Sequence, residues 1–279
     1  MINGWKQIDI GRDPGRLMVA SLADITHLII DMDGVLYRGD QPMPSLREFM
    51  AFLRERPVPF VLATNNSTRT PQEYADKLAG MGVKVAAAEI LVSGQATARY
   101  LARDYPPGTR VHVFGMPALQ QAMVEEGFVL ADENVELVVA SMDRAVTYEK
   151  LKRATLLIRR GARFIATNLD PTNPSEDGLI PGTGAMIAAL AAASGVTPTA
   201  IGKPEPIMYQ LALEMMGARL ETTAALGDRA DTDILGGKRA GLFTICVLSG
   251  SSDRVEAEAF AADWIVNDIE HLLEIWRRQ

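Results

Sequence analysis

The sequence predicts an α/β protein with a doubly wound parallel sheet and a second α/β domain inserted into the chain of the first. Short apolar runs rich in Ile, Leu, Val and Ala recur along the chain, and helical segments separate them. Runs without polar alternation are typical of strands buried on both faces of a parallel sheet. The short connections between strand and helix indicate βαβ units.

The first βα units precede residue 83. The expected elements are a strand at 25–30, a helix at 45–56, a strand at 59–64 and a helix from 70 to 82. Pro57 ends the first helix because a proline lacks the backbone N–H that a continuing helix needs. Pro71 suits the first turn of the second helix, and Gly80 is suited to its end.

The middle of the chain shows a strand–helix alternation of its own, and near residue 200 the pattern of the first βα units resumes. The middle elements are expected at 110–115, 117–127, 135–141, 148–161, 163–168 and 184–195. The later ones are expected at 207–217, 222–228, 231–241, 243–250 and 262–268, followed by a C-terminal helix. We therefore expect a core formed by 1–88 and 199–279, with an α/β cap domain at 89–198.

The composition argues against several classes of partner and of functional site. The chain has 279 residues and a formal net charge of −7, which argues against nucleic acid or an anionic membrane as the main partner. A single cysteine, Cys246, and three scattered histidines exclude a disulfide framework and a zinc cluster. The N-terminal residues contain no signal-peptide pattern, and the apolar run at 185–193 is too short to span a membrane. We expect a cytoplasmic protein whose chemistry rests on carboxylates, hydroxyls and lysines.

Acidic residues follow two of the predicted strands. Asp31 and Asp33 come directly after LII, and Asp228 follows the run AALG. Ligands usually bind at the carboxyl edge of a parallel sheet, and residues i and i+2 of an extended segment point to the same side. Aspartates without histidine or cysteine form an all-oxygen site, which suits Mg²⁺. A D-x-D-G segment alone is common in turns, so the prediction depends on several such signals at separate strand ends.

Together these residues form a set suited to phosphoryl transfer. Asp31 can attack phosphorus as a nucleophile, and Asp33 can protonate the leaving alkoxide and later deprotonate a water. Mg²⁺ would reduce the repulsion between the anionic nucleophile and the phosphate. Lys203 and the hydroxyl of Thr64 can hold phosphate oxygens.

The segments DMDGVLYRG, LATNNSTRT, IGKPEP and GDRADTDI resemble the four motifs of the haloacid dehalogenase (HAD)-like hydrolase superfamily. More narrowly, the chain is similar to the NagD-like, p-nitrophenylphosphatase branch (subfamily IIA). In the middle of the chain ATARYL, FIATNLDP and PGTGAMIAAL are similar to the cap of that branch. The resemblance implies a Rossmann-like HAD core with an inserted α/β cap, and a Mg²⁺-dependent phosphatase.

The resemblance also implies a role for each residue of the site. It makes Asp31 the nucleophile and a metal ligand, and Asp33 the general acid/base that also ligates the metal through its backbone carbonyl. It further implies Asp228 and Asp233 at the metal, with Asp233 also orienting Lys203. At the substrate it implies Thr64, the amide of Asn65, Asn66 and Lys203. It also implies a cap loop of Asn168, Leu169 and Asp170 over the site. Asp231 is left as a helix cap or a supporting residue. The expected substrate is a small phosphate monoester, and relatives that dimerise through the cap make a homodimer an open expectation.

Alternatives are weaker. A dehalogenase would need neither Asp33 nor Asp228, and a P-loop would need glycine where Thr197 and Thr232 stand. Gly182-x-Gly184 follows a proline-rich loop instead of a strand, which disfavours a dinucleotide site, and no G-x-S-x-G elbow supports serine catalysis. A non-catalytic phosphometabolite-binding protein that retains the fold is the runner-up from another class, although pure binding needs no leaving-group acid.

Overall fold

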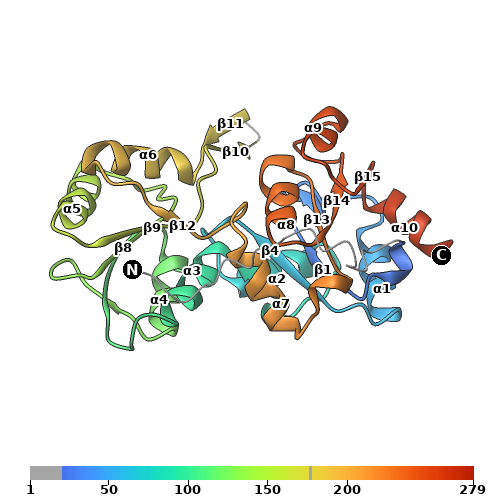
Figure 1. The fold of residues 1–279 in the computed structure, drawn as a ribbon, viewed down its shortest axis with the longest axis horizontal. Coiled ribbons are helices and arrows are strands. Elements are labelled where there is room, and N and C mark those ends of the chain that lie inside the picture. The colour runs from blue at the N-terminus through green and yellow to red at the C-terminus, as the bar shows by residue number, and fades with distance from the viewer. Residues whose placement is uncertain (1–20, 176–177) are drawn as a thin grey trace.

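The computed structural model describes residues 21–175 and 178–279, and it contains two parallel sheets that lie side by side (Figure 1). The larger sheet has six strands in the order β15-β14-β13-β1-β4-β5, and the smaller has five in the order β12-β9-β8-β6-β7. Helices cover both faces of each sheet, as the doubly wound α/β prediction requires.

The six-stranded sheet is the centre of the core domain. Its strands are β1 (His27–Ile30), β4 (Phe60–Thr64), β5 (Ile90–Val92), β13 (Thr223–Gly227), β14 (Phe243–Val247) and β15 (Trp264–Val266). The central strand β1 pairs in parallel with β13 on one side and β4 on the other, so the winding of the sheet reverses next to it. Such a reversal leaves a crevice at the carboxyl ends of the strands, where ligands bind.

Alternate residues of the strands face two different helical layers. Leu28 and Ile30 pack into the cluster that contains α1 (Leu46–Glu55), α2 (Pro71–Gly80) and α10 (Ile269–Arg277), whereas Ile29 packs with α7 (Ile207–Met216). Thr70 accepts a hydrogen bond from the backbone N–H of Glu73, so α2 begins where the sequence predicted. The remaining core helices are α8 (Leu235–Arg239) and α9 (Arg254–Ala259).

The five-stranded sheet is the centre of the cap. Its strands are β6 (Arg110–Phe114), β7 (Val129–Leu130), β8 (Leu137–Ala140), β9 (Arg163–Ala166) and β12 (Thr199–Ala200). The helices are α3 (Ser93–Ala102) and α4 (Pro117–Glu125), which share one apolar cluster, and α5 (Tyr148–Arg159) and α6 (Thr183–Ser194), which share another. Each cluster includes side chains from one face of the sheet.

The strands that pair in each sheet indicate boundaries between core and cap that differ from the expected ones. β5 lies within the range expected for the cap but pairs with β4 in the core sheet, and β12 lies within the expected core range but pairs with β9 in the cap sheet. No strand was predicted from sequence at either of these short segments. We therefore propose that the chain passes into the cap after Val92 and returns after Ala200, a few residues later than 89 and 199.

Smaller elements complete the fold. They are the hairpins β2 (Tyr37–Arg38) with β3 (Gln41–Pro42) and β10 (Thr172–Ser175) with β11 (Gly178–Pro181), the 3-10 turns Leu22–Asp24, Ala87–Glu89 and Leu220–Thr222, and a π-helical turn at Ala230–Ile234. The second hairpin occupies the segment for which the sequence indicated only a loop. Along the described parts of the chain, no helix combines the length and apolar composition that a membrane span requires. The signal-peptide expectation concerns residues outside the described ones.

Candidate active site

Asp31 and Asp33 lie on the loop that follows β1. The N–H of Asp31 still donates to the carbonyl of Leu226 at 2.8 Å, so its position is set by the sheet. The chain then turns at Gly34, whose φ of +87° favours glycine. A Cβ at Gly34 would lie 2.5 Å from Asp228 Oδ2, so the turn also needs glycine to let that carboxylate approach.

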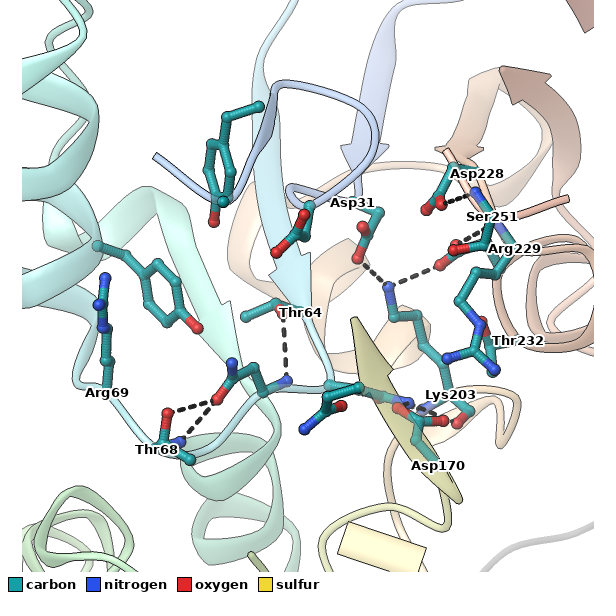
Figure 2. A pocket seen from close by; sticks show the side chains of 18 of the residues that line it. Asp31, Thr64, Thr68, Arg69, Asp170, Lys203, Asp228, Arg229, Thr232 and Ser251 are labelled. Carbon is teal, nitrogen blue, oxygen red and sulfur yellow. Dashed lines mark hydrogen bonds and ion pairs between the residues drawn. The ribbon is translucent and has the colours of Figure 1, made fainter. Parts of the chain in front are cut away.

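The ammonium group of Lys203 lies between two carboxylates of this site. Its Nζ lies 2.5 Å from Asp31 Oδ1 (Figure 2). The same Nζ lies 2.6 Å from Asp233 Oδ1 and donates to the carbonyl of Ala63 at 3.0 Å. Burial alone would lower the pKa of Lys203, but the charges of Asp233 and Asp31 outweigh it and raise that pKa well above its usual value. The lysine is therefore a fixed cation, directed at the nucleophile predicted from sequence.

Three carboxylates form a compact acidic cluster. Asp31, Asp228 and Asp233 each offer one oxygen, and these atoms lie within 4.8 Å of one another. Asp228 accepts a hydrogen bond from the N–H of Ser251 at 2.7 Å. Burial, followed by the negative charge of Asp233, raises the pKa of Asp228 to about 6. Buried oxygen donors of like charge at this separation suit a hard divalent cation, so the residues present fit the expected metal.

Asp33 is not part of that cluster. Its side chain is exposed and borders the pocket, as does Lys77, and its partial burial raises the pKa of its carboxyl. A raised pKa favours the protonated form, which a group that donates a proton needs. The expected contact of its backbone carbonyl with a metal stays a prediction.

The loop after β4 lines one side of the pocket. Thr64 is 7% exposed, and its Oγ1 accepts from the N–H of Asn66 at 3.2 Å. The exposed side chain of Asn66 accepts from the N–H and the hydroxyl of Thr68. Asn66 therefore stabilises the loop from outside, although it also borders the pocket. The buried Asn65 instead directs its side chain to the cap and to the loop of Lys203.

The predicted cap loop does reach the core. Asp170 Oδ2 accepts from Asn65 Nδ2 at 3.0 Å, and Asn168 Nδ2 donates to the backbone carbonyl of Asn65 at 2.7 Å. Burial raises the pKa of Asp170, opposed by the hydrogen bond from Asn65. Leu169 is 48% exposed and does not line the pocket, so of these three residues only Asp170 borders it.

The cavity between core and cap has a volume of about 280 Å³. Its lining also includes charged and polar residues that the sequence analysis did not single out, among them Arg69, Tyr74, Lys77, Arg144, Asn173 and Arg229. Arg144 follows β8 of the cap and forms no ion pair with another described residue. A lone arginine on a loop has no pattern that separates it from other surface cations. Asp231, by contrast, is exposed and pairs with Arg229 at 3.3 Å.

The cysteine and two of the histidines lie outside the acidic cluster. Cys246 is fully buried in β14, and His112 pairs with Asp132 at 3.1 Å on the cap. His27 bonds with the hydroxyl of its neighbour Thr26 at the start of β1. None of the three borders the cavity, as expected.

The fold and the acidic site agree with the comparisons to known proteins. A family profile described as haloacid dehalogenase-like hydrolase matches residues 28–129, and one described as HAD-hydrolase-like matches residues 200–272. An acid sugar phosphatase of Staphylococcus saprophyticus is 40% identical over 231 residues, which are 82% of this chain and 89% of that protein. The chain belongs to the haloacid dehalogenase-like hydrolase family.

Solved structures define the branch. The 4-nitrophenylphosphatase of Thermotoga maritima has a TM-score of 0.87 at 36% identity, covering 91% of this chain and 98% of that one. NagD of Escherichia coli has a TM-score of 0.82 at 35% identity, covering 88% and 97%. A glycerol phosphate phosphatase of Mycobacterium tuberculosis in complex with magnesium has a TM-score of 0.84 at 33% identity, covering 90% and 77%. The protein is a phosphatase of the NagD-like branch, which sets aside the non-catalytic alternative.

Proposed function

We propose that the protein hydrolyses small phosphate monoesters in a Mg²⁺-dependent reaction through an aspartyl-phosphate on Asp31. The observation that carries the proposal is the position of Asp31, which lies within hydrogen-bond distance of the Lys203 ammonium and beside Asp228 and Asp233. A carboxylate held by a cation in a confined pocket can approach an anionic phosphorus that it would otherwise repel.

In the first step an oxygen of Asp31 attacks phosphorus in line, and the bond from phosphorus to the leaving oxygen breaks. The protonated carboxyl of Asp33 donates its proton to that oxygen, so the alcohol leaves neutral. Lys203, the Thr64 hydroxyl and the backbone N–H of Asn65 stabilise the equatorial phosphate oxygens. The raised pKa of Asp33 supports the protonated form that this step needs.

In the second step a water attacks the aspartyl-phosphate, and the Asp33 carboxylate accepts the water's proton. The acyl phosphate P–O bond breaks, inorganic phosphate leaves, and the Asp31 carboxylate is restored. Asp33 thus serves first as acid and then as base, which requires a carboxyl that borders the pocket and reaches the leaving oxygen. Its exposed side chain, which borders the pocket, is compatible with both roles.

The residues that would hold Mg²⁺ are Asp31, Asp228 and the backbone carbonyl of Asp33, with Asp233 completing the carboxylate cluster and holding Lys203. The bound ion supplies positive charge that offsets the repulsion between nucleophile and phosphate. The compact all-oxygen cluster and the magnesium complex of the mycobacterial relative support this assignment.

The substrate is a small phosphate monoester whose leaving group lies between core and cap. A cavity of about 280 Å³ suits a sugar, polyol or similar small phosphate and disfavours a phosphoprotein. Relatives named acid sugar phosphatase and glycerol phosphate phosphatase support this class. Asp170 of the cap would contact the leaving group, and Asn66 would border it.

The test is hydrolysis of p-nitrophenyl phosphate by the wild type and by Asp31→Asn, each with Mg²⁺ and with EDTA. We expect turnover only for the wild type with metal, and a loss of at least about 10⁴-fold in the variant, because the amide is a poor nucleophile. Circular dichroism and thermal unfolding verify that the variant is folded. A folded variant that retains most of its activity contradicts the mechanism.

A further inference from the structure

The side chain of Asn65 bonds to two segments that lie far from it in the chain. The proposed reaction uses only its backbone N–H. Its amide also bonds to Lys203, which lies 138 residues further along, and to Asp170 in the cap loop. The residue is 8% exposed, so these bonds lie largely out of contact with water.

The two bonds to Lys203 form a clamp on its backbone. The N–H of Lys203 donates to Asn65 Oδ1 at 2.8 Å, and Asn65 Nδ2 donates to the carbonyl of Lys203 at 2.8 Å. Only asparagine and glutamine combine an acceptor and a donor in one planar group of this kind. One side chain thus satisfies both backbone polar groups of the residue whose Nζ lies between Asp31 and Asp233.

The second amide hydrogen connects this clamp to the cap. Asn65 Nδ2 also donates to Asp170 Oδ2 at 3.0 Å, and the return bond runs from Asn168 Nδ2 to the backbone carbonyl of Asn65. Lys203 N–H can only donate, whereas its carbonyl and the Asp170 carboxylate can only accept, so the three partners define one orientation of the amide.

Gly202 allows the close approach that the clamp requires. A Cβ at this position would lie 2.6 Å from Asn65 Oδ1 and 2.5 Å from the carbonyl oxygen of Thr167. The N–H of Gly202 donates to that same carbonyl at 2.8 Å. The loop that carries Gly202 and Lys203 therefore passes between Asn65 and the end of β9, with no room for a side chain at position 202.

We propose that Asn65 is a positioning residue that fixes the backbone of Lys203 and connects it to the cap loop through Asp170, so that the lysine ammonium stays between Asp31 and Asp233. This inference depends on the proposed function only in assigning Lys203 to the phosphate and the nucleophile. It gives the cap a share in ordering the catalytic lysine, besides any contact with the leaving group.

The first test compares Asn65→Ser with Asn65→Asp, using p-nitrophenyl phosphate and saturating Mg²⁺. Serine cannot bond both backbone groups of Lys203, and aspartate keeps the acceptor but loses both donors. Because the backbone N–H at position 65 remains, we expect KM to change by less than about threefold while kcat falls at least about thirtyfold in both variants. Asn267→Asp, on an exposed loop after β15, is the matched control and retains the wild-type kcat.

The second test restores the hydrogen bond between positions 65 and 170 with donor and acceptor exchanged. In the double variant Asn65→Asp with Asp170→Asn, the amide at position 170 can donate to the carboxylate at position 65. We expect kcat to recover roughly fivefold or more relative to Asn65→Asp alone, because the sites are in direct contact and their effects are not additive. Rates are measured below the unfolding temperature of each variant, so that a loss of folded protein does not lower kcat.

The outcomes separate this inference from the proposed function. A folded Asn65→Ser variant with wild-type kcat overturns the clamp, as does a rise in KM at unchanged kcat. Failure of the double variant to recover overturns the connection through Asp170. The proposed function fails in a different way, through a wild type without turnover or an active Asp31→Asn variant.

Discussion

Two buried aspartates, one in each domain, follow strands of similar sheets and yet have different surroundings. Asp143 follows β8 of the cap, is 3% exposed, and accepts from Lys150 Nζ at 2.6 Å and from the N–H of Ala145 at 2.8 Å. Asp228 follows β13 of the core, is 2% exposed and forms no ion pair within the described residues. Its near neighbours include the carboxylates of Asp31 and Asp233.

The difference identifies which sheet edge carries chemistry. A buried carboxylate with its own cation is satisfied and stabilises the fold, whereas a buried carboxylate facing others of like charge needs a cation from outside. We therefore expect the cap edge to supply structure and contacts, and the core edge to carry the proposed reactive and metal-binding groups. The same architecture serves both because function depends on the groups at the strand ends.

Within this comparison of the two aspartates, the largest effect is expected when the same change is made in both domains. Asp228→Asn removes a proposed metal ligand, so kcat/KM should fall about 10³-fold while the unfolding temperature stays equal or rises, since like-charge repulsion is relieved. Asp143→Asn should leave kcat/KM within about threefold but lower stability by roughly 1–3 kcal/mol, because Lys150 loses its charged partner. Thermal unfolding and steady-state kinetics measure both. A loss of stability without loss of activity at Asp228 would remove the distinction.

The next effect concerns Asp33, which lies outside the acidic cluster. Asp33→Asn cannot donate a proton, so hydrolysis of an alkyl phosphate such as glycerol phosphate should slow about 10²-fold or more. The kcat/KM for p-nitrophenyl phosphate should fall less than about tenfold, since p-nitrophenolate leaves without a proton and kcat/KM does not include the later step in which Asp33 acts as base for both substrates. Steady-state kinetics with both substrates test this. Equal losses for the two substrates contradict the assignment of Asp33 as leaving-group acid.

The pH dependence of metal binding sharpens the comparison further. The raised pKa of Asp228, about 6, means that this carboxyl takes up a proton as the pH falls through that value. A protonated carboxyl is a poor ligand, so Mg²⁺ affinity should fall about tenfold for each pH unit below about 6. Calorimetric titration with Mg²⁺ at several pH values from about 5 to about 8 measures this affinity. Affinity that does not change across this window contradicts the site.

The smallest effect is expected on the cap. Arg144→Gln removes a cation that borders the cavity, so KM for a phosphate monoester with a second acidic group should rise roughly three- to tenfold with kcat little changed. A neutral polyol phosphate should be affected less. Arg159→Gln, at the exposed end of α5 and away from the cavity, is the matched control. A fall in kcat with unchanged KM would instead give Arg144 a part in the chemistry.

Much of this could be predicted from local pattern. Buried runs predicted β1, β4 and β13, and Pro71 with Thr70 predicted the start of α2, because burial and capping act over a few residues. Asp31, Asp33 and Asp228 were identified because a strand end in a parallel sheet confines its following residues to one edge. The short strands β5 and β12 were missed, because their sheet membership depends on pairing with β4 and β9, which are distant in the chain from the residues that flank them.

The sequence by itself determined the two α/β domains and the set of carboxylates, lysine and hydroxyl at the core edge. Only the tertiary structure decided which buried aspartate has its own cation, which cap residues border the cavity, and how Asn65 reaches Lys203. Those relations join residues far apart in the chain, and they depend on distances and burial that no local pattern encodes. Neighbouring groups determine the pKa and the hydrogen bonds of a side chain, and the fold determines which groups are its neighbours.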